Sequence, residues 1–85
     1  MMKYNLILYL IECPIHDFVC DSPRIGKIGE KTKNWEECGR KCENNDNCSF
    51  WHYYIRASGC YLYRYCRMHH SPGNLMGVKF CPKRK

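Results

Sequence analysis

Acidic residues are missing from the second half of the 85-residue chain: none follows Asp46, although lysines and arginines continue to the last residue. A pair of glycosidase carboxylates therefore cannot be drawn from that half. No Ser-His-Asp set or phosphate-binding loop can be assembled from the rest of the chain. We expect a protein that is not an enzyme and that has no cofactor.

Long apolar runs are also missing. The apolar run at residues 6–11 is too short to span a bilayer. It follows a lysine-containing start, as in a signal peptide, but its core is short and no small-x-small cleavage site comes after it. We interpret residues 1–12 as a marginal or truncated signal segment, and a folded edge strand is the alternative. No repeat, coiled coil or low-complexity region is found.

Cysteine is abundant, with eight residues in a chain of 85. A chain this short buries little apolar surface, so small domains often rely on disulfides or metal. Zinc sites usually contain tight C-x2-C pairs, which are absent here, and the histidines (His16, His52, His69 and His70) show no ligand spacing. The even count favours a disulfide scaffold in an oxidising compartment, hence a secreted protein without metal. Because an unpaired thiol would be a liability there, Cys66 is not expected to act as a nucleophile with His69 or His70.

The clearest element is a helix that begins at Trp35. Asn34 is a good N-cap, and Glu37 at the third helical position completes a capping box. Trp35, Cys38 and Cys42 recur at i, i+3 and i+7, which places them on one stripe of the helix. This stripe predicts a helix that is fixed to the rest of the fold through its cysteines.

The remaining chain reads as short strands and turns. We expect the segments in this order: a strand at 18–20, a turn and strand at 24–30, a strand at 48–55, a hairpin loop at 56–59, a return strand at 60–65, a loop at 69–74 and a last strand at 75–81. The predicted fold class is α+β, with a single helix packed on a small antiparallel β-sheet, and disulfide-rich.

The charge is uneven as well. The formal net charge is +6, and its excess lies in the second half. Such asymmetry indicates an anionic partner, for example a glycosaminoglycan, an acidic protein, a lipid surface or nucleic acid. The alternative is that the charge merely keeps a small domain soluble.

One face of the predicted sheet is rich in aromatic residues. If Trp51, Tyr53 and Ile55 face the core beside Leu62, their neighbours crowd the opposite face, next to several arginines. Planar rings provide stacking surfaces, and guanidinium groups bind sulfate or carboxylate. The candidate ligand-binding residues are Phe50, His52, Tyr54, Arg56, Tyr61, Tyr63, Arg64 and Arg67. The alternative is that these are ordinary strand aromatics.

Several motifs, taken in order, resemble the PAN/apple domain family over about residues 18–82. They are Trp35-x-x-Cys38-Gly39-x-x-Cys42, Cys48-x-x-Trp51-x-Tyr53, Cys60-x-Leu62 and Gly77-x-x-x-Cys81. The resemblance implies a five-stranded antiparallel sheet that cradles one helix. It also implies the disulfides Cys38–Cys60, Cys42–Cys48 and Cys20–Cys81. Cys13 and Cys66 have no place in that framework, so Cys13–Cys66 follows only by elimination. We assign residues 13–82 to this domain and residues 83–85 to a basic tail.

The resemblance further implies an extracellular module that binds proteins or carbohydrates. Our first hypothesis is a secreted recognition or adhesion module that binds carbohydrate, including a sulfated glycosaminoglycan such as heparin, or protein through the basic, aromatic face. The second is a cationic host-defence or toxin-like peptide that acts on membranes or channels, which the mixed charge of the helix opposes. Nucleic-acid binding ranks last because disulfide-rich proteins rarely meet nucleic acid. The oligomeric state is left open.

Overall fold

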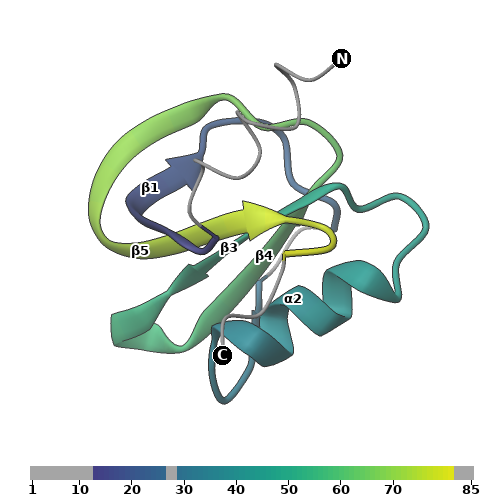
Figure 1. Ribbon diagram of the computed structural model, residues 1–85, viewed down its shortest axis with the longest axis horizontal. Helices are drawn as coiled ribbons and strands as arrows, with labels where there is room; N and C mark the ends of the chain where they lie inside the picture. Colours follow the sequence, from purple (N-terminus) through teal and green to yellow (C-terminus); the bar gives the residue numbers. More distant parts are fainter. Residues whose placement is uncertain (1–12, 27–28, 82–85) are drawn as a thin grey trace, which may run out of the picture.

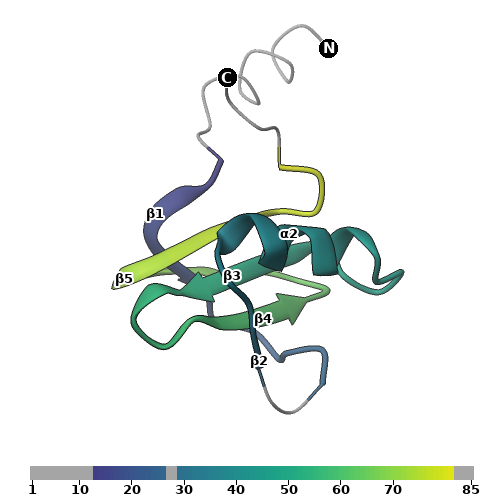
Figure 2. The same cartoon turned by 90° about the horizontal axis from the view of Figure 1, so that it is seen from below.

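The fold combines a five-stranded antiparallel sheet with one α-helix in the residues that the computed structural model describes, 13–26 and 29–81. The elements are β1 (Ile15–Cys20), β2 (Glu30–Lys31), α2 (Trp35–Glu43), β3 (Phe50–Tyr54), the 3-10 helix η1 (Ile55–Ala57), β4 (Gly59–Tyr63) and β5 (Met68–Val78). The strand order is β1-β5-β3-β4-β2, and α2 packs against β3 and β4 (Figures 1 and 2). The α+β prediction is therefore confirmed.

Two expectations fall outside this part of the chain. The signal segment at residues 1–12 and the basic tail at 83–85 lie outside the described residues. Within the described ranges, no helix is long and apolar enough to span a membrane.

The helix begins as its sequence predicts. The Asn34 side chain accepts a hydrogen bond from Glu37 N at 2.9 Å. The Glu37 carboxylate in turn accepts from Lys33 N at 2.6 Å, one residue before the backbone group of an ideal capping box. Cys38 and Cys42 are fully buried on the face turned to the sheet. Local capping and a two-cysteine stripe thus fix both the start of the helix and the side that faces inward.

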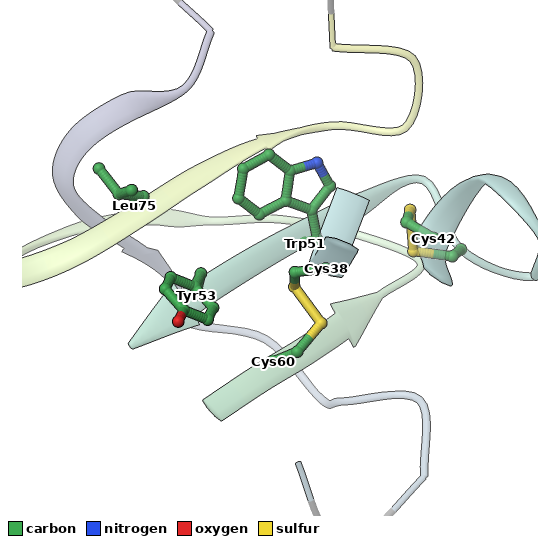
Figure 3. Close-up of a cluster of buried hydrophobic side chains, with 7 residues drawn as sticks. Cys38, Cys42, Trp51, Tyr53, Cys60 and Leu75 are labelled. Atoms are coloured by element: carbon green, nitrogen blue, oxygen red, sulfur yellow. A yellow bond between two sulfur atoms is a disulfide. The ribbon is translucent and has the colours of Figure 1, made fainter. Parts of the chain in front are cut away.

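Trp51 of β3 is the centre of the main core, between α2 and the sheet (Figure 3). Its indole is fully buried and stacks on Trp35 of the helix, with ring centroids 5.6 Å apart and planes at 8°. The indole Nε1 donates to Val78 O at 3.0 Å, so the one polar atom of the ring is satisfied. Two glycines, Gly39 of α2 and Gly77 of β5, allow the close approach of this ring.

Four disulfides link the elements, and two of them are the nested pair that the resemblance implied. Cys38–Cys60 joins α2 to β4 (Figure 3), and Cys42–Cys48 closes the turn that follows the helix.

The other two disulfides differ from the expectation. Instead of Cys20–Cys81 and Cys13–Cys66, the bonds are Cys13–Cys81 and Cys20–Cys66. The reason is the antiparallel pairing of β1 with β5, in which Ile15 lies opposite Met76 and Cys20 lies opposite Met68. Cys13 and Cys81 therefore meet at one end of β1, and Cys20 and Cys66 at the other. A strand of six residues keeps Cys20 far from Cys81.

The chain from 68 to 78 is one curved strand, whereas a loop was expected at 69–74. Residues 68–70 of β5 pair with the second half of β1, and residues 75–76 pair with its start (Figure 1). Four residues, 71–74, lie opposite the single residue Asp17. The sequence Pro72-Gly73, which predicted a loop, therefore lies in a large β-bulge. Proline and glycine are tolerated there because a bulge interrupts the ladder.

The hairpin loop between β3 and β4 begins one residue earlier than expected. Ile55 was expected in a strand and facing inward, but it belongs to η1 and is 50% exposed. The turn is completed by Ser58 in a left-handed conformation, φ 56°. The alternation of β3 therefore ends at Tyr54. The main core contains Leu75 of β5, which lies opposite Tyr53, and does not contain Ile55.

The two glycines beside Trp51 give a matched test of this core. A Cβ at Gly77 would lie 2.5 Å from the buried Trp51 ring, whereas one at Gly39 would lie 3.5 Å from it, an ordinary contact. We expect Gly77→Ala to lower the free energy of unfolding by about 1–3 kcal/mol through overpacking. Gly39→Ala should leave it unchanged or raise it by up to about 1 kcal/mol, because alanine favours helix. Denaturant unfolding with intact disulfides measures both, and equal effects would contradict this account of the Trp51 packing.

Candidate functional site

The sheet face away from α2 carries a shallow depression of about 320 Å³. Because side chains alternate along β3, the residues on either side of Trp51 and Tyr53 point to this face. The lining residues come from β1, the 24–25 segment, β3, β4 and the bulge of β5: Val19, Arg24, His52, Tyr54, Tyr61, Ser71, Pro72 and Asn74.

Stacked rings form one side of the depression. His52 stacks on Tyr61 across the β3–β4 pair, with centroids 4.8 Å apart, and on Tyr63 at 5.7 Å. The guanidinium of Arg24 lies over the Tyr61 ring, 4.4 Å from its centroid, in a cation–π contact. A hydrogen bond of 3.0 Å between the Tyr63 hydroxyl and His52 Nδ1 fixes the position of the His52 ring in this stack.

Arg24 reaches this position because its backbone continues the sheet. Arg24 forms an isolated antiparallel bridge with Tyr63, and Ile25 N donates to Leu62 O at 2.8 Å. Arg24 was not among the candidate ligand-binding residues. No periodicity marks it, and a bridge to a strand nearly forty residues away cannot be read from local sequence.

The opposite side of the depression is polar. Asn74 is buried at the end of the β5 bulge, and its Nδ2 donates to Ser71 Oγ at 3.1 Å and to Ser71 O at 3.3 Å. These bonds use the amide nitrogen, which leaves the Asn74 carbonyl oxygen as an acceptor for a ligand. Ser71 and Asn74 were placed in a loop by sequence and were not candidates. Their role depends on the bulge.

His52 is neutral in this environment. Burial, and then the positive charge of Arg24, lower its pKa from the ordinary 6.5 to about 4. A neutral imidazole can stack and exchange hydrogen bonds without adding charge to the depression. Burial also raises the pKa of Tyr63, so its phenol remains a hydroxyl.

The structure brings together only some of the predicted site residues. His52, Tyr54 and Tyr61 line the depression, and Arg56 lines a neighbouring one. Tyr63 was expected at the surface but is 2% exposed, and His52 is 8% exposed. Tyr63 is covered because it packs with Cys20 and Met76 in a second core on this face, and His52 stacks on Tyr63.

The other three candidates lie elsewhere. Phe50 lines a separate apolar depression with Ile15, Met68 and Met76. Arg64 follows the end of β4 and donates to Asn47 Oδ1 at 2.7 Å. Arg67 N donates to Ser22 Oγ beside the Cys20–Cys66 bond.

The described part of the chain contains neither a cluster of metal ligands nor a free thiol. No group of three His, Cys, Asp or Glu side chains within residues 13–26 and 29–81 could hold a metal ion. All eight cysteines lie in these ranges and are paired, so Cys66 is not available as a thiol.

Comparisons with a family model and with solved structures both find similar proteins. The family model of the PAN domain matches residues 21–79. Among solved structures, the fold is similar to that of TgMIC4-A5, determined as a complex with lacto-N-biose on NOE-derived distance restraints. The two chains are 20% identical with a TM-score of 0.73, and the match covers 80% of this chain and 97% of that one. No curated protein matches the chain significantly.

The pKa of His52 predicts how stability varies with pH. Between pH 6.5 and about 4 the unfolded chain binds a proton at this histidine and the folded protein does not. The free energy of unfolding should therefore fall as the pH is lowered through this window, by up to about 3 kcal/mol from this residue. The variant His52→Asn cannot titrate and should lack this component. Denaturant unfolding at several pH values measures the difference between the two proteins.

The exposed His69 provides the matched control, because His69→Asn removes an imidazole outside the aromatic stack and should leave the component from His52 in place. A constant difference between wild type and His52→Asn from pH 6.5 to 4 would contradict the lowered pKa.

Proposed function

Because the chain belongs to the PAN domain family, we propose that it is a carbohydrate-binding recognition module and not an enzyme. The observation that carries the proposal is the depression on the sheet face away from α2, with an aromatic side at Tyr61 and a polar side at Ser71 and Asn74. This is the arrangement that a sugar ring requires, since it has an apolar C–H face and a rim of hydroxyls.

Each side of the depression has a distinct part in this proposal. The C–H face of a sugar would lie on the exposed part of Tyr54 or Tyr61. Its hydroxyls would exchange hydrogen bonds with Asn74, Ser71 and the Arg24 guanidinium. His52 supports Tyr61 from below and contributes no charge at neutral pH.

The similar fold of TgMIC4-A5 supports a glycan ligand, because that protein was solved with lacto-N-biose. Four disulfides support a secreted protein, since such bonds persist in oxidising compartments.

The arginines that were expected to bind heparin lie apart in the structure. Arg56 and Arg64 flank opposite ends of β4 (Gly59–Tyr63), so the arginines expected to bind sulfate together do not form one patch. Any affinity for sulfated glycans would depend on Arg24 and Arg56, which line the two depressions.

An NMR titration of the labelled protein with lacto-N-biose and a panel of mono- and disaccharides tests the proposal. We expect shift changes centred on Tyr54, Tyr61 and Asn74. Arg24→Ala should weaken binding about tenfold, because it removes charge-assisted hydrogen bonds to the sugar. Arg64→Ala removes the same charge from an exposed site outside the depression and should leave the Kd unchanged.

Two results would contradict the proposal. One is shift changes that map to the helix side of the sheet. The other is an equal loss of affinity in Arg24→Ala and Arg64→Ala, which would indicate a general charge effect.

A further inference from the structure

A second depression, of about 380 Å³, adjoins the first. It is lined by Tyr54, Ile55, Arg56, Pro72 and Gly73. Tyr54 and Pro72 line both depressions, so these two side chains form their common border. A ligand with more than one unit could reach both depressions by crossing this border.

The second depression differs from the first in its chemistry. It lacks the stacked histidine and the buried amide, and its charged lining residue is Arg56 on the exposed η1 turn. Arg56 forms no ion pair with any residue in the ranges 13–26 and 29–81. Its guanidinium is thus available to an anion from outside the protein.

One carboxylate lies close to this depression and has to be considered. Asp17, opposite the bulge of β5, accepts a hydrogen bond from Gly73 N at 3.1 Å through Oδ1. That bond holds the Asp17 carboxylate against the backbone of Gly73, at the edge of the depression. The negative charge of Asp17 weakens the attraction of the depression for an anion, but Asp17 forms no ion pair with Arg56.

We propose that the two depressions form one extended site for an acidic oligosaccharide. The first depression takes a neutral sugar ring, and the adjoining unit presents a carboxylate or a sulfate to Arg56 across Tyr54 and Pro72. This inference rests on the proposed function and adds to it a second subsite and an anionic ligand class. A guanidinium fork binds either anion with two hydrogen bonds, so the shared feature is the anionic group.

The test compares lacto-N-biose with two derivatives, one carrying a sialic acid and one carrying a sulfate on the unit that would reach Arg56. NMR titration gives the Kd of each. We expect at least one acidic derivative to bind about tenfold more tightly than the neutral sugar. The two derivatives separate carboxylate from sulfate recognition.

Arg56→Gln should abolish this gain and leave the Kd of the neutral sugar unchanged, because Arg56 lies outside the first depression. Arg64→Gln is the matched control and should preserve the gain. Asp17→Asn should increase the affinity for the acidic derivatives about twofold by removing a nearby negative charge. Asparagine tolerates the left-handed conformation of residue 17, φ 67°, and can still accept from Gly73 N.

The outcomes separate the two proposals. If the neutral sugar binds with dependence on Arg24 but the acidic derivatives bind no more tightly, the second subsite is wrong and the glycan-binding function stands. The second subsite is also wrong if the acidic derivatives still bind more tightly than the neutral sugar in Arg56→Gln. If no sugar of the panel binds, both proposals are wrong. Binding of an acidic peptide, with no glycan bound, would overturn both in favour of a protein ligand.

Discussion

The packing of Trp51 between helix and sheet is the contact on which the rest of the fold depends. The indole stacks on Trp35, meets Gly39 of α2 and Gly77 of β5, and donates to the backbone of β5. One side chain thus fixes the distance of the helix from two strands. The Cys38–Cys60 bond then holds the helix over β4, so that neither layer can shift relative to the other. A small domain needs such covalent support because its core is limited.

This rigid side of the sheet positions the candidate site on the other side. Trp51 and Tyr53 face the helix. Because side chains alternate along β3, His52 and Tyr54 face the depression on the other side of the sheet. The aromatic stack at Tyr61 packs against the second core. A surface that is formed in advance loses little conformational entropy on binding.

The ligand-facing groups that surround this stack come from irregular parts of the chain. The bulge of β5 supplies Ser71, Pro72 and Asn74, and the 24–25 segment supplies Arg24. Regular strands therefore hold the aromatic residues in place, while the polar lining residues lie on a bulge and a loop.

The sequence by itself determined the elements whose causes are local. The Asn34 cap, the stripe of Cys38 and Cys42, the α+β class and the alternation around Trp51 all follow from neighbouring residues. It could not determine the register of β1 against β5, because short strands carry no local signal for their partners. That register decided the bonds Cys13–Cys81 and Cys20–Cys66 and the bulge of β5. The position of Arg24 was set by its bridge with Tyr63 of β4. The candidate aromatics were thus predictable, whereas their burial and their polar partners were set by contacts between segments far apart in the chain.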